Sequence, residues 1–386
     1  MNIRYIKITF FMVMALMPFT VCALDIKDVI KEVRMKYVPD SRQDIFDVKC
    51  VEKQGNVVIE GVTTRADAKE ALIGMLDGIN FVDSIKVLRS DCWAQVSVPV
   101  ACFRTNPGHS KELATQAVMG HPVCLLEKQG EWYRARTLDG YIAWVIDNSL
   151  TLKTEKQMDE WRKSKRFVIT APHQVYAYVR PGGNGLREIV TELVNGSIVK
   201  GEVTKDGGYI MVTLPDGRKG WIESDAAIPA DIWANQDFNP GLILDLAYSM
   251  EGSPYLWGGT STKSLDCSGL SKVSYFANGR ILMRDASQQA RNGQKIEAKD
   301  WRTCKAGDLL FFGNAKTRSV THVAIYDNNG NYVHSSGRVK RNSLDSESNL
   351  YLDIYLLQAV RIDGSEGKPG ITLAIKHPWL FEVNNR

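Results

Sequence analysis

The stretch Thr262–Gly279, with the sequence TKSLDCSGLSKVSYFANG, decides the fold of the largest domain. Cys267 follows an aspartate, and apolar residues then recur at helical spacing at Leu270, Val273 and Ala277. The pattern predicts a helix with Cys267 in its first turn. Because unpaired amides and the helix dipole favour negative charge there, Cys267 is a candidate thiolate nucleophile. The alternative is a buried cysteine that only begins the helix.

A nucleophilic cysteine needs a histidine base that is close in space. Of six histidines, four fall in other predicted domains or in the C-terminal tail, which leaves His322 and His334 on the two sides of the turn DNNG. If residues 328–330 form a three-residue loop with Gly330 left-handed, both imidazoles lie on one strand face. A two-residue loop would separate them. The first register predicts a chain in which His322 takes the proton of Cys267 and His334 orients its ring. The alternative for His334 is a strand surface residue.

The N-terminus predicts export. Arg4 and Lys7 precede the apolar run ITFFMVMALMPF, and VCA ends at Ala23, so residues 1–23 are predicted to be a secretory signal peptide. A buried first helix and lipidation at Cys22 are the alternatives. We expect a periplasmic or extracellular protein, and no other stretch predicts a membrane span.

Length and charge bound the remaining possibilities. The 386 residues, 44% of them hydrophobic, predict several domains. Loss of the two basic residues of the signal peptide would lower the formal net charge from +4 to +2. This balance gives no reason to expect nucleic acid as a partner. We expect a monomer.

Residues 24–92 predict a small α/β domain. A strand pattern in NVVIEGV is followed by the helical pattern TRADAKEALIGML and a second strand pattern in VDSIKVL. The arrangement resembles the BON-type domain of exported bacterial proteins.

An internal repeat with an offset of 77 residues follows. GEWYRARTLDGYIAWV at 130–145 aligns without gaps on GGYIMVTLPDGRKGWI at 207–222. In each copy two strand patterns flank an Asp-Gly turn, and we expect Trp144 and Trp221 in the core. The copies predict two small β-barrels that resemble bacterial Src-homology-3-like domains. The barrels span 96–152 and 167–227. The charged stretch between them is predicted to be a helical linker.

Residues 239–386 predict an α+β domain, because helical patterns are followed by a run of strand patterns. Asn239 followed by Pro240 predicts the start of its first helix. The tail from Lys368 onward is not assigned.

Six cysteines remain after the signal peptide. Export permits disulfides, and the pairs Cys50–Cys92 and Cys102–Cys124 are possible bridges. Cys304 lies before a turn with no helix start and is predicted to be a small core residue. Without a C-x-x-C pair a zinc ribbon is not expected. We expect neither a metal nor another cofactor.

Six motifs of the last domain occur together in a known order. PYLWGG, DCSGL, RDASQQ, GDLLFF, THVAIY and VHSSG have the order and spacing of the NlpC-type cell-wall cysteine peptidases, over about residues 240–362. The resemblance implies a papain-like core with Cys267 as nucleophile, His322 as base and His334 as third polar residue. Tyr255 matches the tyrosine beside the nucleophile. Ser264 and Leu265 precede Asp266 where the family usually has a glycine.

Two Src-homology-3-like domains before such a domain resemble the γ-D-glutamyl-L-diamino acid endopeptidases. The resemblance implies cleavage of peptidoglycan stem peptides with a free N-terminal L-Ala, in a cleft closed by the first barrel. Glu112 and Asp285 would bind the substrate ammonium, since a buried ammonium needs charged partners. Tyr141, or alternatively Tyr133, would contribute from the first barrel. The remaining substrate-binding candidates that the resemblance implies are Tyr255 and Asp266.

Two other functions stay open on the sequence. The barrels and an inert third domain could form a cell-wall peptide-binding protein, although the intact set of cysteine and histidines disfavours this. An NlpC-like amidase or acyltransferase acting on another substrate would share the same motifs. The fold class is the same in each case: a multidomain α+β protein with a papain-like cysteine peptidase domain after two small barrels and an N-terminal α/β unit.

Overall fold

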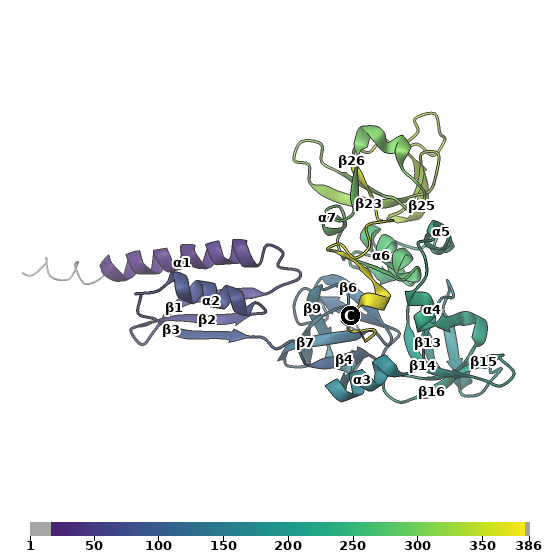
Figure 1. Ribbon diagram of the computed structural model, residues 1–386, viewed down its shortest axis with the longest axis horizontal. Helices are drawn as coiled ribbons and strands as arrows, with labels where there is room; N and C mark the ends of the chain where they lie inside the picture. The colour runs from purple at the N-terminus through teal and green to yellow at the C-terminus, as the bar shows by residue number, and fades with distance from the viewer. Residues whose placement is uncertain (1–16, 383–386) are drawn as a thin grey trace, which may run out of the picture. The chain divides into compact units, whose positions relative to one another are not determined.

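The computed structural model describes the backbone of residues 17–382 and the side chains from residue 26 onward (Figure 1). The chain forms two compact units that divide between Ser90 and Asp91, and each is described by itself. Residues 1–16 of the predicted signal peptide lie outside the described residues. Helix α1 (Met17–Tyr37) begins inside that predicted segment. Within residues 17–382, no helix combines the length and the apolar character that crossing a membrane requires.

The N-terminal unit is a three-stranded sheet covered by two helices. Its elements are α1, β1 (Phe46–Lys53), β2 (Asn56–Thr63), α2 (Ala66–Met75) and β3 (Val82–Val87). The strand order is β1-β2-β3, with β1 antiparallel and β3 parallel to β2. Ile30, Leu72 and Ile59 belong to one buried cluster between helices and sheet. The two predicted strands are β2 and β3, and the first helix and strand were not predicted.

The first β-domain, Trp93–Lys153, follows. It has seven strands in the order β10-β4-β7-β8-β9-β5-β6. The strands are β4 (Trp93–Val96), β5 (Val100–Arg104), β6 (Leu113–Val118), β7 (Pro122–Gln129), β8 (Trp132–Arg136), β9 (Ile142–Ile146) and β10 (Leu150–Lys153). Phe103, Val123 and Val145 are fully buried in its core.

The second β-domain, Arg166–Pro229, has the order β13-β12-β16-β15-β14-β11-β17. The strands are β11 (Arg166–Ile169), β12 (Val175–Tyr178), β13 (Ile189–Leu193), β14 (Ile198–Val203), β15 (Tyr209–Thr213), β16 (Lys219–Glu223) and β17 (Ala227–Pro229). Between the β-domains lies the predicted linker helix, α3 (Glu155–Lys163), whose capping box begins at Thr154.

The two repeat copies form equivalent hairpins. Trp132 pairs with Ile146 in β8–β9, and Tyr209 pairs with Glu223 in β15–β16, which is the same register shifted by 77 residues. Gly140 and Gly217 have φ of +84° and +90°, the left-handed conformation that these turns require. Trp144 is buried as predicted, whereas Trp221 is only half-buried.

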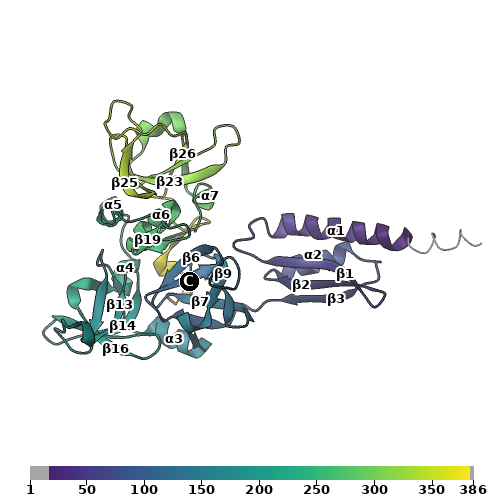
Figure 2. The same cartoon turned by 180° about the vertical axis from the view of Figure 1, so that it is seen from behind.

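The last domain packs its two longest helices against one side of a six-stranded antiparallel sheet and the short 3-10 helix Ala298–Thr303 against the other (Figures 1 and 2). The sheet order is β21-β26-β22-β23-β24-β25. Its strands are β21 (Gln294–Glu297), β22 (Leu309–Gly313), β23 (Val320–Tyr326), β24 (Asn331–Ser336), β25 (Arg338–Ser343) and β26 (Leu356–Arg361). Leu270 of α6 (Cys267–Ala277), Ile243 of α5 (Pro240–Ser249) and Val323 of β23 share one buried core. The predicted cap Asn239 accepts from the amide of Gly241 at 2.9 Å.

Shorter elements complete this part of the chain. They are α4 (Ala230–Ala234), β18 (Thr260–Ser261), β19 (Ser264–Leu265), β20 (Arg280–Leu282), α7 (Ala286–Gln289) and β27 (Ile371–Leu373). The tail contacts both β-domains and the linker. His377 Nε2 lies 3.0 Å from the carbonyl oxygen of Leu138, and Arg166 donates to that of Leu380 at 2.7 Å. Its packing across domain boundaries explains why sequence periodicity did not place it.

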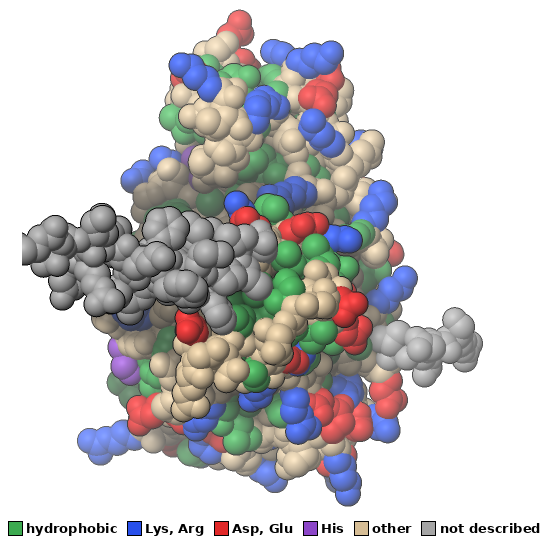
Figure 3. Space-filling view, turned by 90° about the vertical axis from the view of Figure 1, so that its left-hand side faces the viewer, with side chains coloured by type: hydrophobic (Ala, Val, Ile, Leu, Met, Phe, Trp, Pro, Cys, Tyr) green, Lys and Arg blue, Asp and Glu red, His purple; other side chains and the backbone are tan. Residues whose placement is uncertain are grey.

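The two suggested disulfides are absent. Among the described residues, no disulfide joins Cys50, Cys92, Cys102 or Cys124, and none involves Cys267 or Cys304. Cys50 and Cys92 belong to different compact units, and Cys102 and Cys124 lie on β5 and β7, which are not neighbours in the sheet. The pairing was wrong because sequence spacing carries no information on these strand positions. On the face drawn in Figure 3, basic and acidic side chains are interspersed, in keeping with the small net charge.

Candidate active site

The start of α6 is held by a buried ion pair. Asp266 is the N-cap residue, and its Oδ1 accepts from the amide of Gly269 at 2.7 Å. Arg284, fully buried, donates to both carboxylate oxygens, with Nη1 3.1 Å from Oδ1. The amide of Gly258 donates to Oδ2 at 2.9 Å. Together these contacts fix the position of Cys267, the next residue.

Asp266 was predicted to bind substrate, and its contacts argue against that. Both of its oxygens already accept hydrogen bonds from within the protein, and the residue is only 5% exposed. It therefore offers no free carboxylate oxygen to a ligand. Arg284, for which no role was predicted, donates to both of these oxygens.

Cys267 lies where β23 and β24 separate. The two strands pair at Ile325–Val333 and Tyr326–Tyr332, next to their turn. Farther along, the backbone amide of Val323 is near enough to the Cys267 sulfur to lower the pKa of the thiol. The hydroxyl of Ser335 on β24 donates to the carbonyl oxygen of Leu265 at 3.0 Å. The segment before α6 thus contacts both strands, and these strands carry the two histidines.

The hairpin register predicted from the sequence is confirmed. The amide of Asp327 donates to the carbonyl oxygen of Asn331 at 2.9 Å, and Gly330 has a φ of +84°. The loop therefore has three residues. His322 Nε2 lies 2.7 Å from His334 Nδ1, as the same-face arrangement requires.

Asn342 extends this chain and was not predicted. Its Oδ1 lies 2.9 Å from His334 Nε2, and its Nδ2 donates to the carbonyl oxygen of Leu350 at 2.9 Å. The bond to Leu350 fixes which end of the amide faces the histidine. Asn342 lies on β25, which follows the hairpin, and no motif of the sequence marks it.

The chain of hydrogen bonds determines both tautomers. Asn342 Oδ1 can only accept, so His334 Nε2 must carry a proton. In a neutral imidazole the other nitrogen, His334 Nδ1, is then an acceptor, and His322 Nε2 must donate to it. The lone pair of His322 Nδ1 is left free to take a proton.

Burial keeps both rings neutral. It lowers the pKa of His322 to about 3, with further lowering by His334 and Lys340. Burial also lowers the pKa of His334 to about 4, although the hydrogen bond to Asn342 raises it. At neutral pH the tautomer assignment therefore applies to two uncharged imidazoles.

The thiol of Cys267 is neutral as well. Burial, followed by the charge of Asp266, raises its pKa to about 11, although the amides of Val323 and Ser268 and the charge of Arg284 lower it. The position at the helix N-terminus is therefore not enough to ionise the free thiol, and the predicted proton transfer to His322 remains the route to the thiolate. The same residue that caps the helix, Asp266, opposes the dipole effect.

Tyr255 lies beside the nucleophile. Burial, followed by the charges of Cys267 and Asp266, raises the pKa of its hydroxyl to about 12. Its amide donates to the carbonyl oxygen of Gly337 at 3.0 Å, which fixes the loop next to β24. At neutral pH this hydroxyl is a proton donor.

The two predicted ammonium-binding acids both flank this region. Glu112, exposed and just before β6, accepts from Trp257 Nε1 at 2.6 Å, and Trp257 is two residues beyond Tyr255. Asp285 is the N-cap of α7, and its Oδ1 lies 4.0 Å from Nη1 of Arg284. Glu112 reaches the loop that carries Tyr255, and Asp285 adjoins the arginine that holds the cap of α6.

The first β-domain is docked closely on the nucleophile loop. The amide of Gln116 on β6 donates to Thr260 Oγ1 at 2.8 Å, and its side-chain oxygen accepts from the amide of Thr260 at 2.9 Å. Arg284 Nε donates to the carbonyl oxygen of Ala114 at 3.2 Å. A Cβ at Gly258 would lie 2.3 Å from the carbonyl oxygen of Leu113, so only glycine fits there.

The tyrosine candidates differ in surroundings. Tyr141 packs against the core of the first β-domain and follows the turn whose Asp139 pairs with Lys272 of α6 at 2.9 Å. Tyr133 packs against the same core, and the ammonium of Lys128 lies 4.7 Å from its ring centre. The choice of Tyr141 as the tyrosine that contacts substrate stays a prediction. Among the described residues, no three His, Cys, Asp or Glu side chains converge as metal ligands would.

Comparison with known proteins decides the family. Residues 252–361 match the NlpC/P60 family, and residues 103–150 match the bacterial dipeptidyl-peptidase Sh3 domain. Dipeptidyl-peptidase 6 of Lysinibacillus sphaericus is 30% identical over 268 residues, which cover 67% of this chain and 94% of the relative. The chain belongs to the NlpC/P60 family. It is a peptidase, and it carries the Src-homology-3-like domain of its dipeptidyl-peptidase relatives.

Further relatives agree with this NlpC/P60 assignment. The γ-D-glutamyl-L-lysine dipeptidyl-peptidase of Bacillus cereus is 28% identical over 246 residues, 59% of this chain and 68% of the relative. The crystal structure of an NlpC/P60 family protein from Bacillus cereus superposes with a TM-score of 0.59, covering 70% of this chain and 99% of that one at 22% identity. This likeness shows a shared fold.

Proposed function

We propose that this NlpC/P60 peptidase hydrolyses the bond between γ-D-Glu and an L-diamino acid in peptidoglycan stem peptides that have a free N-terminal L-Ala. The observation that carries the chemistry is the bonded chain from His322 through His334 to Asn342. Both histidines lie on strands that pack against α6, the helix that begins at Cys267. The substrate class rests on the dipeptidyl-peptidase relatives and on the positions of Glu112 and Asp285.

The first step would be acylation. Because the thiol is neutral, His322 Nδ1 would take its proton as the sulfur of Cys267 attacks the γ-carbonyl carbon of D-Glu. His334 would stabilise the resulting imidazolium by accepting the bond from His322 Nε2. The neutral hydroxyl of Tyr255 would donate to the developing oxyanion.

The second step would release the products. His322 would return the proton to the amine of the diamino acid as the C–N bond breaks, which leaves a γ-glutamyl thioester on Cys267. Water, deprotonated by His322, would then hydrolyse the thioester and free L-Ala-γ-D-Glu. No cofactor takes part in this scheme.

The free amino terminus would set the specificity. Glu112 and Asp285 would form charge-assisted hydrogen bonds to the L-Ala ammonium, and Tyr141 would close the site from the first β-domain. Peptides whose L-Ala is still linked to glycan lack this ammonium. The enzyme would thus act on released stem peptides, as a monomer outside the inner membrane.

The deciding experiment incubates the protein without its first 23 residues with L-Ala-γ-D-Glu-diaminopimelate. Mass spectrometry should show L-Ala-γ-D-Glu and the free diamino acid, and nothing with Cys267→Ala. A folded wild-type protein that releases neither product, but binds the tripeptide, would leave a binding protein as the function. Cleavage only of other amide substrates would identify an amidase instead.

A further inference from the structure

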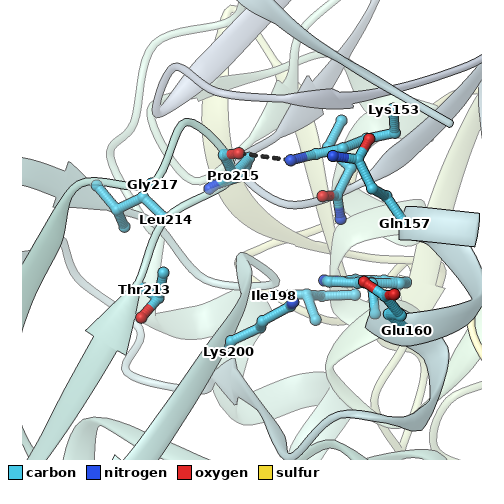
Figure 4. A pocket seen from close by; sticks show the side chains of 11 residues that line it. Lys153, Gln157, Glu160, Ile198, Lys200, Thr213, Leu214, Pro215 and Gly217 are labelled. Atoms are coloured by element: carbon cyan, nitrogen blue, oxygen red, sulfur yellow. Dashed lines mark hydrogen bonds between the residues drawn. The ribbon is translucent and has the colours of Figure 1, made fainter.

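A hollow away from the peptidase domain separates the linker helix from the second β-domain (Figure 4). Its volume is about 230 Å³, and none of its lining residues comes from the domain that carries Cys267. The linker side contributes α3 and the end of β10, and the other side contributes β14 and the β15–β16 turn. In Figure 4, Lys153 and Pro215 lie on one side of the hollow and Ile198 and Lys200 on the other.

Two lysines face this hollow without a carboxylate partner. Lys153 Nζ donates to the carbonyl oxygen of Pro215 at 2.7 Å, which uses one of its three protons. Lys200 reaches the same space from β14. Within the described part of the chain, neither ammonium has a carboxylate within ion-pair distance. Two positive charges that face one hollow from opposite sides and are partly withdrawn from water favour an anion between them.

The electrostatics of Lys153 agree with this geometry. Burial lowers its pKa, and the positive charge of Lys200 lowers it further, whereas Asp216 raises it. A bound anion would offset both unfavourable effects, because it would pair with the ammonium and weaken the repulsion between the lysines.

Helix α3, on the linker side of the hollow, contributes a negative charge. Glu160 of α3 lines it and has no ion pair within the described residues. Gln157, one turn earlier, uses Oε1 to accept from the amide of Thr154 at 2.9 Å, so its NH₂ group stays available to a ligand. The hydroxyl of Thr213 and the buried ring of Trp161 complete the lining.

The repeated turn explains why this place is open. In the first β-domain the Asp139–Gly140 turn is covered, since Asp139 pairs with Lys272 and His377 contacts Leu138. The equivalent turn of the second β-domain borders the hollow through Pro215 and Gly217. The same structural unit therefore docks the peptidase domain in one copy and leaves a ligand-sized space in the other.

We propose that this hollow is a second binding site, which takes a short zwitterionic peptide with its carboxylate between Lys153 and Lys200 and its ammonium at Glu160. Glu160 disfavours a polyanion, which has no positive charge to offer it, and the small volume disfavours a long chain. The choice of L-Ala-γ-D-Glu as the probe rests on the proposed function, because that dipeptide would be the product. The site itself does not depend on catalysis.

Equilibrium dialysis with labelled L-Ala-γ-D-Glu tests the site. Wild type should bind two equivalents per chain, one in the catalytic cleft and one in the hollow. The double variant Lys153→Met/Lys200→Met should lose one equivalent and keep its rate of tripeptide hydrolysis. Lys205→Met, an exposed lysine on the same β-domain, is the matched control and should bind two. Unchanged stoichiometry and affinity in the double variant would overturn the proposal.

A milder variant tests the second charge. Glu160→Gln should weaken binding of the dipeptide at the hollow about tenfold and leave its N-acetyl form unaffected. If inorganic phosphate bound as tightly as the dipeptide and Glu160→Gln changed neither affinity, the hollow would be a simple anion site. That result would contradict the proposal that it binds a zwitterionic peptide. The two proposals fail separately. Lysine-dependent binding without hydrolysis would reject only the proposed activity, and hydrolysis with a single binding site would reject only the hollow.

Discussion

Asn342 Oδ1 lies 2.9 Å from Nε2 of His334, and this contact sets the proton positions of both histidines. The amide cannot rotate without losing its bond to the carbonyl oxygen of Leu350. It therefore acts on His322 through His334, as a positioning residue. A substrate atom need not touch it.

Replacing Asn342 should lower turnover more than substrate affinity. Asn342→Leu removes the acceptor that fixes the tautomer of His334, and a lost hydrogen bond of about 1–3 kcal/mol corresponds to a fall in kcat of about 5- to 160-fold, with KM little changed. Asn342→Asp keeps an acceptor and should restore most of the rate. Asn349→Leu, exposed in the following loop, is the control. Nitrogen-15 shifts of His334 should report the loss of the Nε2–H tautomer in the leucine variant only, and an unchanged tautomer there would refute the assignment.

Cys267 should be essential for hydrolysis, and its thiol should ionise only at high pH. Cys267→Ala should abolish hydrolysis and leave the circular dichroism spectrum unchanged, whereas Cys304→Ala should stay active. Because the pKa of Cys267 is raised to about 11, alkylation of the free enzyme should keep accelerating above pH 9 rather than level off near the ordinary thiol pKa. Cys304 has its pKa raised to about 12 and should react more slowly. A plateau of Cys267 labelling below pH 8 would show a resting thiolate.

Arg284 should matter for folding as well as rate. Arg284→Met leaves Asp266 charged and buried without its partner, and breaking a buried pair in this way costs about 3–5 kcal/mol. We expect a lower Tm and little activity. Arg291→Met, an exposed arginine just beyond α7, should change neither. Thermal unfolding of both variants checks this, and a wild-type Tm for Arg284→Met would show that the cap does not depend on the ion pair.

The nearby residues show what the sequence could and could not predict. The helix start at Cys267 and the three-residue loop after Asp327 follow from local patterns, so both were predicted. Asn342 contacts residues eight positions away along the chain and Arg284 contacts Asp266 eighteen positions away, and no motif marks either residue. The neutral state of Cys267 depends on burial and on Asp266 together, which only the packed structure reveals.

Acid should destabilise the fold before it protonates any buried histidine. Burial lowers the pKa of His121 and His334 to about 4 and that of His322 to about 3, against an ordinary value of 6.5. Between pH 6.5 and 4 the unfolded chain binds protons that the folded chain does not, so stability falls as pH falls through this window. Each such histidine contributes up to about 1.4 kcal/mol per pH unit. Urea midpoints from pH 7.5 to 4.5 should decline, with a shallower decline for His121→Asn. A flat profile would show that the imidazoles are accessible to water.

The substrate amino terminus should be required because of its charge. Acetylation of L-Ala would leave Glu112 and Asp285 without their cation, at a cost on the order of a few kcal/mol. Wild type should therefore cleave L-Ala-γ-D-Glu-diaminopimelate at least 100-fold faster than its N-acetyl form.

Glu112→Gln and Asp285→Asn should each slow cleavage of the free peptide and narrow this ratio. Glu131→Gln, an exposed acid elsewhere on the first β-domain, should leave it intact. Competition between the two peptides in one reaction, followed by mass spectrometry, gives the ratio directly. If wild type cleaved the free and the N-acetyl peptide at equal rates, neither acid would bind the substrate ammonium. The first β-domain would then contribute only the contacts of β6 with the peptidase domain.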